Sequence, residues 1–217
     1  MVISEEMPMS VSAEAYRTIR TNIKYSSIDK IRKTILVTSS LPGEGKSTVV
    51  GNLAFVLSEN DTKVLVIDCD LRKPTIHKLF NTSRNRGLTD LLINKCNEED
   101  VIKNISKSLD IITAGTRVPN PAEVVGSNKL KMLIDDMSFK YDYILIDSPP
   151  VLAVADAQML AAKCDGTILV VRSNKTKEKI VRRSSMELKR VNADIIGTIL
   201  NDHKLRKSYE YYKYYGE

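Results

Sequence analysis

The sequence has no tryptophan, only three cysteines and no apolar run long enough to cross a bilayer. Cys69, Cys96 and Cys164 lie far apart and form no CxxC pair, which argues against the common zinc and dithiol motifs. Their odd number, with no signal peptide, predicts reduced thiols in a cytoplasmic protein. A membrane-spanning helix needs about 20 apolar residues. We therefore expect any membrane attachment to depend on a partner.

Positive charge is in moderate excess, with 33 Lys and Arg against 27 Asp and Glu, a net charge of +6. Part of this excess lies in residues 175–190, and part lies just before the C-terminus at Lys204, Arg206 and Lys207. Such a surplus suits nucleic acid, an acidic partner or an anionic membrane, and it also suits a solvated helix face. Charge alone does not decide between these interpretations.

The 217 residues alternate short β-branched apolar runs with longer helical patterns. Strands are predicted at 34–40, 63–70, 109–115, 141–150, 166–173 and 195–201, with long helices at 46–60, 127–138 and 176–191. This alternation predicts an α/β fold, with a mostly parallel central sheet and helices on both faces. We expect an N-terminal helical arm at 1–30, a catalytic domain at 31–203 and a tail at 204–217.

A glycine-containing loop, SSLPGEGKST, lies between the first expected strand and the first long helix. Its second half is a candidate phosphate cradle formed by Gly43, Glu44, Gly45, Lys46, Ser47 and Thr48. Glycines let backbone N–H groups approach phosphate oxygens, and the next helix points its positive end at the anion. In this pattern Lys46 reaches the β- and γ-phosphates of ATP, and Ser47 binds Mg²⁺. Ser40 replaces the first glycine of the strict P-loop pattern, so the loop is a variant.

Acidic residues end two of the expected strands: Asp68 and Asp70 follow one strand, and Asp147 follows another. Ligands of open α/β sheets bind outside these strand ends, so the carboxylates and the P-loop are expected to meet in one crevice. We assign Ser47, Asp68 and Asp147 to Mg²⁺, and Asp68 or Asp70 to the role of general base. A single aspartate at such a position is often only a turn former or a helix cap.

A basic pair, Arg72 and Lys73, follows these carboxylates closely. Either side chain could neutralise charge on a transferred phosphoryl group. The alternative is a surface pair that balances the nearby acids.

The N-terminal arm carries a charged stripe, Glu14, Arg17 and Arg20, at a spacing of three residues. On a helix these side chains share one face, where they could pair with the same stripe of a second subunit. The spacing alone favours a simpler interpretation, an ion pair within the helix worth about 0.2–0.5 kcal/mol.

More than half of the tyrosines occupy the C-terminal tail. The tail ends in SYEYYKYYGE, and the five candidate phosphate acceptors are Tyr209, Tyr211, Tyr212, Tyr214 and Tyr215. Their spacing fits neither a strand nor a helix. Beside a predicted ATP site, a strip of phenol hydroxyl groups suggests phosphorylation.

Together these features resemble the bacterial tyrosine kinases, P-loop enzymes that accompany capsule and exopolysaccharide synthesis. The resemblance rests on the stripe at Glu14, the P-loop, VIDCDLRKP, ILIDSPP and the tyrosine tail. It implies autophosphorylation of the tail in trans, within a ring to which the Glu14 stripe contributes. It also implies a membrane-spanning activator, enzymes of sugar-nucleotide metabolism as further substrates, no nucleic-acid partner, and a place at the inner face of the membrane. Asn201 resembles a residue that contacts the nucleotide base in related ATPases.

Two other functions remain open from the sequence. A spatial organiser ATPase of the MinD or ParA type would use residues 175–190 to bind membrane or DNA. Such ATPases usually carry an extra lysine near the start of the phosphate loop, and Leu41, Pro42 and Gly43 supply none. A nucleotide-gated scaffold without transferase activity is the second possibility.

Overall fold

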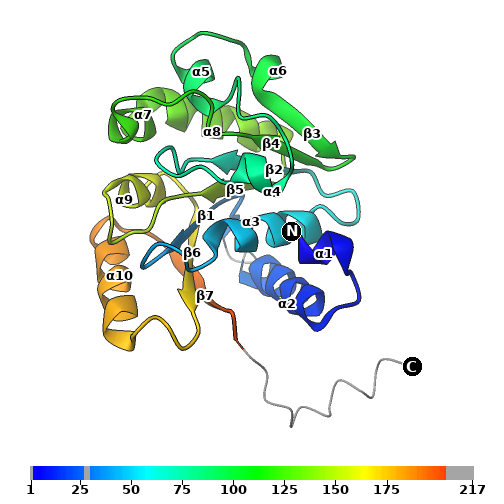
Figure 1. Cartoon of the computed structure of the whole chain (residues 1–217), viewed down its shortest axis with the longest axis vertical. Coiled ribbons are helices and arrows are strands. Elements are labelled where there is room, and N and C mark those ends of the chain that lie inside the picture. Colours follow the sequence, from blue (N-terminus) through cyan, green and yellow to red (C-terminus); the bar gives the residue numbers. More distant parts are fainter. Residues whose placement is uncertain (1, 27–29, 204–217) are drawn as a thin grey trace.

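Seven strands form one sheet in the order β3-β4-β2-β5-β1-β6-β7 (Figure 1). The structure is a computed structural model, and it describes residues 2–26 and 30–203. The strands are β1 (Thr34–Ser39), β2 (Val64–Asp68), β3 (Ile102–Ser106), β4 (Leu109–Ile112), β5 (Tyr143–Asp147), β6 (Gly166–Arg172) and β7 (Ile195–Asn201). All neighbours pair in parallel except β3, which runs antiparallel to β4. The predicted mostly parallel α/β fold is confirmed.

The sequence did not predict β3, and its environment explains why. Its residues, IKNIS, are only partly buried, so the strand lacks the continuous apolar run of the inner strands. The inner strands β1 and β2 are buried along their whole length, as expected for parallel strands covered on both faces.

Ten helices lie within the described residues, and most are short. They are α1 (Ile3–Glu6), α2 (Val11–Ser26), α3 (Lys46–Leu57), α4 (Ile76–Leu79), α5 (Leu88–Leu92), α6 (Glu98–Val101), α7 (Pro121–Gly126), α8 (Asn128–Lys140), α9 (Asp156–Ala161) and α10 (Glu178–Arg190). The three long helices predicted from the sequence correspond to α3, α8 and α10. Of these helices, none is long and apolar enough to cross a membrane.

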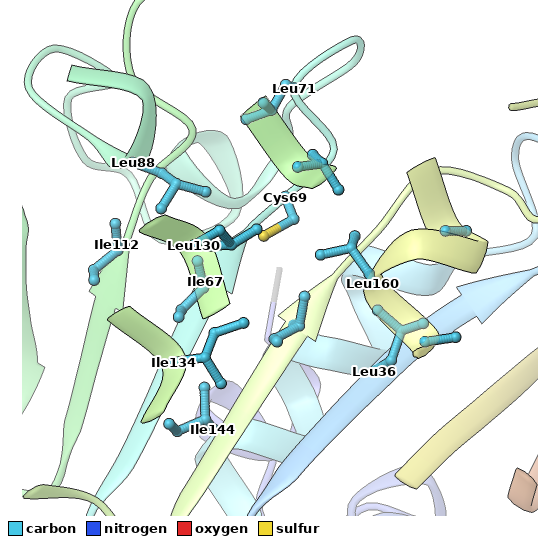
Figure 2. Packing of buried hydrophobic residues seen from close by; sticks show 14 of the residues in the cluster. Leu36, Ile67, Cys69, Leu71, Leu88, Ile112, Leu130, Ile134, Ile144 and Leu160 are labelled. Atoms are coloured by element: carbon cyan, nitrogen blue, oxygen red, sulfur yellow. The ribbon is translucent and has the colours of Figure 1, made fainter. Parts of the chain in front are cut away.

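Two hydrophobic layers, one on each face of the sheet, hold the fold together. On one face, Ile35, Val66 and Leu145 pack with α2 and α3. On the other face, neighbouring strand residues such as Leu36 and Ile67 pack with α5, α8 and α9 (Figure 2). Because side chains alternate along a strand, each inner strand contributes to both layers.

Helix α3 is buried on nearly all sides rather than along one stripe. The predicted stripe residues Val49, Leu53 and Leu57 face the sheet layer, but Gly51 and Asn52 are buried as well. The reason is that α1 and α2 cover the outer side of α3, where Asn52 Oδ1 accepts a hydrogen bond of 2.9 Å from the Ser4 backbone N–H. The described part of the N-terminal arm is therefore packed on the P-loop helix. The division of the chain at residues 30 and 203 stays a prediction.

Candidate active site

The phosphate loop joins β1 to α3 at the carboxyl edge of the sheet. Gly43 and Gly45 both have positive φ, +79° and +89°, a backbone region that glycine enters without steric cost. Gly45 also lies where a Cβ atom would stand 2.1 Å from the Asn201 amide nitrogen. The backbone conformation and this close contact both require glycine at position 45. Lys46 and Ser47 follow in the first turn of α3.

Two contacts that hold this loop were not expected from the sequence. The Glu44 side chain is only 3% exposed; it accepts a hydrogen bond of 2.8 Å from the Leu41 N–H and another from the Thr176 hydroxyl. The Ser184 hydroxyl donates to the Ser40 hydroxyl at 2.8 Å. Glu44 therefore fixes the loop conformation, and Ser40 has a buried partner at the position where the strict motif has glycine.

The carboxylates predicted from the sequence meet beside this loop. Asp68 and Asp147 are register partners on the neighbouring strands β2 and β5. The Ser47 hydroxyl donates to Asp147 Oδ2 at 2.5 Å and accepts from the Thr75 hydroxyl at 2.6 Å. The structure thus brings together Ser47, Asp68 and Asp147, and it adds Thr75, which the sequence did not single out.

Burial and nearby negative charges perturb both carboxyl groups. Burial raises the pKa of Asp147 to about 7; the Ser47 hydrogen bond and the Lys46 charge oppose this shift, and the Asp70 charge adds to it. Burial, followed by the charge of Asp147, also raises the pKa of Asp68 well above its usual value. Two buried carboxyl groups with raised pKa values, next to a lysine in a crevice, are typical of a functional site.

The donor set at this position fits a hard divalent cation. Asp147 Oδ1 is buried and has no hydrogen-bond partner among the described residues. Together with the Ser47 hydroxyl and Asp68, it offers the oxygen ligands that Mg²⁺ prefers. No group of three or more His, Cys, Asp or Glu side chains placed to bind a metal occurs in residues 2–26 and 30–203. A cation here would therefore share its coordination with phosphate oxygens and water.

Asp68 also has a structural role. Its Oδ2 accepts hydrogen bonds from the backbone N–H groups of Thr75 (3.2 Å) and Ile76 (3.1 Å), and its Oδ1 accepts one from that of Asp70 (3.2 Å). It therefore shapes the turn that leads into α4. Asp70 is less engaged, since its Oδ1 accepts a hydrogen bond of 2.9 Å from the Lys73 N–H.

The basic pair after Asp70 separates in the structure. The Arg72 guanidinium forms an ion pair with Asp156, at the start of α9, at 2.9 Å. Lys73 is exposed to solvent. Asp156 was missed by sequence reasoning, because nothing near it in the chain indicates that its carboxylate faces the loop after β2.

A groove of about 690 Å³ runs along the outer side of the phosphate loop. Gly43, Gly45 and Thr48 line it together with Asn201 and His203. Asn201 lies beside the loop, where its amide donates to the Glu44 carbonyl at 3.0 Å. A contact between Asn201 and a nucleotide base stays a prediction.

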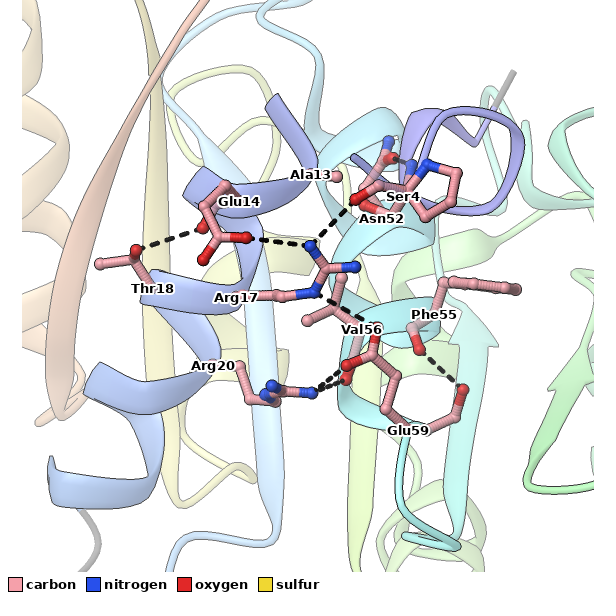
Figure 3. A network of polar contacts seen from close by, with 12 residues as sticks. Ser4, Ala13, Glu14, Arg17, Thr18, Arg20, Asn52, Phe55, Val56 and Glu59 are labelled. Atoms are coloured by element: carbon pink, nitrogen blue, oxygen red, sulfur yellow. Dashed lines mark hydrogen bonds and ion pairs between the residues drawn. The ribbon is translucent and has the colours of Figure 1, made fainter. Parts of the chain in front are cut away.

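The stripe on α2 is occupied within the chain itself (Figure 3). Arg17 donates to Glu14 at 2.9 Å, the pair within the helix that the spacing favours. Glu59, which follows α3, also attracts Arg17, at 3.6 Å, and forms an ion pair with Arg20. Arg20 also donates to the Val56 carbonyl at 2.9 Å. A subunit contact through this stripe stays a prediction.

The five candidate acceptor tyrosines, residues 209–215, lie outside the described residues. The last described residue, His203, lines the groove beside the phosphate loop. The chain therefore leaves the described part close to the P-loop.

Comparison with known proteins decides between the functions left open above. A ParA-type family model, described as NUBPL iron-transfer P-loop NTPase, matches residues 30–212. Tyrosine-protein kinase YwqD of Bacillus subtilis is 43% identical over 99% of this chain and 91% of its own length. The chain belongs to the bacterial tyrosine-protein kinases. Putative tyrosine-protein kinase CapB of Staphylococcus aureus is 36% identical over 98% of this kinase and 93% of its own length.

Some relatives of this kinase are much longer. The relatives named EpsB in Ralstonia solanacearum and etk in Escherichia coli K12 are 35% and 33% identical. The chain covers 27% and 29% of their lengths. It thus corresponds to one part of those proteins.

Solved structures lead to the same family. The chimerical protein CapA2B2 superposes with a TM-score of 0.90 at 35% identity, over 94% of this kinase and 90% of that chain. The kinase domain of E. coli ETK gives 0.91 at 32% identity, over 96% and 82%. MinD of Pyrococcus horikoshii, complexed with Mg-ADP, is 28% identical with a TM-score of 0.67, over 81% and 72%. The chain is a protein-tyrosine kinase with a P-loop NTPase fold.

Proposed function

We propose that this kinase uses MgATP to phosphorylate the tyrosines of its own tail, in trans within an oligomer. The observation that carries the proposal is the approach of the P-loop Ser47 hydroxyl to the buried Asp147 carboxylate, at 2.5 Å. This contact brings the loop that cradles phosphate to the carboxylate that ends a neighbouring strand. Five tyrosines in a strip then offer acceptors that a nucleotide hydrolase would not need.

The residues of the site divide the chemistry between them. Backbone groups from Gly43 to Thr48 bind the phosphates, and Lys46 stabilises charge on the β- and γ-phosphates. Ser47, Asp68 and Asp147 would hold Mg²⁺. When bound there, the ion would neutralise negative charge on the phosphate oxygens. Most of the rate then comes from positioning, because phosphoryl transfer leaves the protein little covalent work.

The general base is Asp68 or Asp70, and the contacts favour Asp70. A phenol with a pKa of about 10 benefits from a carboxylate that accepts its proton as the bond to phosphorus forms. Both Asp68 oxygens already accept backbone hydrogen bonds, whereas Asp70 Oδ2 accepts none within the described part of the chain. Asp70→Asn should therefore lower the rate of transfer more than it weakens nucleotide binding, a difference that steady-state kinetics would reveal.

The cellular role we infer is control of capsular or exopolysaccharide synthesis and export. Supporting observations are the relative named EpsB, the relative described as a putative tyrosine-protein kinase in the cps region, and the similarity to the chimerical protein CapA2B2. None of the described helices of this chain could span a membrane. As part of this proposal, a membrane-spanning activator brings the kinase to the inner face of the membrane, where sugar-nucleotide enzymes are further candidate substrates.

Mass spectrometry of the tail peptide after incubation with MgATP tests the proposal. We expect several phosphates on residues 204–217 in the intact kinase and none in Lys46→Met, which lacks the cation of the phosphate loop. Persistent tail phosphorylation of purified Lys46→Met would reject autophosphorylation. Release of phosphate without labelled protein would instead indicate a hydrolase of the MinD type, whose fold this kinase shares.

A further inference from the structure

A bidentate ion pair joins two of the loops that carry the acidic residues of the site. Arg72 Nε lies 2.9 Å from Asp156 Oδ2, and Arg72 Nη2 lies 3.1 Å from Asp156 Oδ1. Arg72 belongs to the loop after β2, and Asp156 begins α9 in the segment after β5. Because β2 and β5 are neighbours in the sheet, the pair bridges the two strand ends that carry Asp68 and Asp147.

The two partners differ sharply in burial. The Asp156 side chain is 1% exposed, and the Arg72 side chain is 42% exposed. Within the described residues, Arg72 is the only side chain that donates a hydrogen bond to the Asp156 carboxylate. A buried carboxylate destabilises the fold unless it is paired, and an apolar residue could fill the same space at less cost. Stability alone therefore does not account for an aspartate at this position.

The geometry fixes the direction of the arginine. A guanidinium has five N–H donors in a rigid plane, and Asp156 engages two of them. The others remain on a half-exposed side chain at the carboxyl edge of the sheet, two residues after Asp70. The Asp156 hydrogen bond, with a smaller contribution from the Asp70 charge, raises the pKa of Arg72. A planar cation with free donors matches the oxygens of a phosphoryl group.

We propose that Asp156 is a positioning residue that orients Arg72 to bind the phosphoryl group as it passes from ATP to tyrosine. The inference rests on the proposed kinase site. Neither side chain forms or breaks a covalent bond. The fixed cation stabilises the charge on the phosphoryl oxygens in the transition state. Orientation matters because a misplacement of about 1 Å costs on the order of 10²-fold in rate.

The test compares Asp156→Asn, Arg72→Lys and the double variant in the full chain, with a tyrosine peptide as acceptor. We expect each single variant to lower kcat by about 10- to 100-fold. Lysine cannot form the two parallel hydrogen bonds of a guanidinium, and the neutral amide introduced by Asp156→Asn does not hold the Arg72 guanidinium in one orientation. The KM for ATP should change by no more than about threefold, and the double variant should be no slower than Arg72→Lys alone. Asp156→Glu should restore part of kcat. Asp100→Asn is the matched control. It breaks the exposed ion pair between Arg86 and Asp100, whose atoms lie 3.3 Å apart at a place outside the crevice.

Two results would overturn the inference. The first is an Asp156→Asn kinase with a lower Tm but an unchanged kcat, as expected for a purely structural ion pair. The second is a double variant whose loss equals the sum of the two single losses in free energy, since the residues would then act independently. If Asp156→Asn does not fold, Arg72→Lys is measured alone, because a lysine is tolerated at this half-exposed position. An unchanged kcat of Arg72→Lys would then reject the proposed role of Arg72 in phosphoryl transfer. Failure of the wild-type chain to phosphorylate the peptide would count against the proposed function instead.

Discussion

The two carboxylate oxygens of Asp147 differ in their surroundings: Oδ2 accepts a hydrogen bond of 2.5 Å from the Ser47 hydroxyl, and Oδ1 is buried without a hydrogen bond from the described residues. An unpaired buried oxygen destabilises a fold and is kept where function requires it. We propose that a cation delivered with the nucleotide satisfies Oδ1.

Asp147→Asn should separate stability from activity. Removing one of two adjacent buried carboxylates relieves repulsion with Asp68, so the nucleotide-free variant should melt about 2–4 °C higher, or about 1 kcal/mol for a chain of this size. Tail phosphorylation should fall by about 10²-fold or more. Thermal melting and phosphate incorporation check the two effects. Asp142→Asn is the matched control: it lies at the opposite end of β5, where Asp142 accepts a hydrogen bond of 2.9 Å from the Lys63 N–H.

A double substitution, Arg17→Ala with Arg20→Ala, tests the contact stripe on α2. If the stripe joins subunits, light scattering should show smaller particles, and tail phosphorylation should fall with them. The Tm should drop only slightly, because partly exposed ion pairs such as those with Glu59 contribute about 1 kcal/mol or less.

The control for this experiment is Arg182→Ala, which removes a more exposed surface arginine that is paired with Glu178 on α10. Particles of unchanged size in the α2 double variant would mean that the stripe serves only the α2–α3 packing seen in Figure 3.

Asp194 links the segment before β1 to the loop before β7, and its contribution to stability should depend on pH. It accepts hydrogen bonds from Lys30 at 3.2 Å and from Arg32 Nη2 at 3.1 Å. Burial raises the pKa of Asp194, but these two cations outweigh it, so the net pKa is lowered. A lowered carboxyl pKa contributes stability above the unfolded-state pKa of about 3.9, and this contribution disappears as the pH falls through the folded value.

Asp194→Asn should therefore melt below the wild-type kinase at pH 7, and the two curves should converge below about pH 4. Melting temperatures recorded between pH 3 and 7 check this. Asp61→Asn, which removes a fully exposed pair with Lys107, should show a smaller difference at every pH. A gap that widens toward acid would contradict the assignment.

The proximity of Ser47, Asp68 and Asp147 could be predicted from the sequence because these residues belong to contiguous motifs. A glycine loop between a strand and a helix is expected at the edge of a parallel sheet. An aspartate that follows four apolar strand residues is expected at the same edge. These positions alone place Asp68, Asp147 and Ser47 together. The strand β3 could not be placed, since its half-exposed alternation resembles a loop.

Other parts of the site could not be predicted because they arrive from distant segments. Asp156, Thr176 and Ser184 approach the loops only through the packing of α9 and α10, and no local pattern reports such long-range partners. The same holds for Glu59, whose ion pairs with α2 depend on where the N-terminal segment crosses α3. Such supporting residues contact the loops and helices of the site but belong to no sequence motif.

A mixing experiment tests the central claim most directly. Full-length Lys46→Met, which retains its tail but cannot transfer phosphate, is incubated with MgATP and a kinase truncated after Arg206, which retains its P-loop but lacks every tail tyrosine. Mass spectrometry then reads residues 207–217 of the Lys46→Met chain. We predict phosphates on these tyrosines, supplied by the truncated partner. An unmodified tail would contradict transfer between subunits, provided that the intact kinase phosphorylates itself under the same conditions.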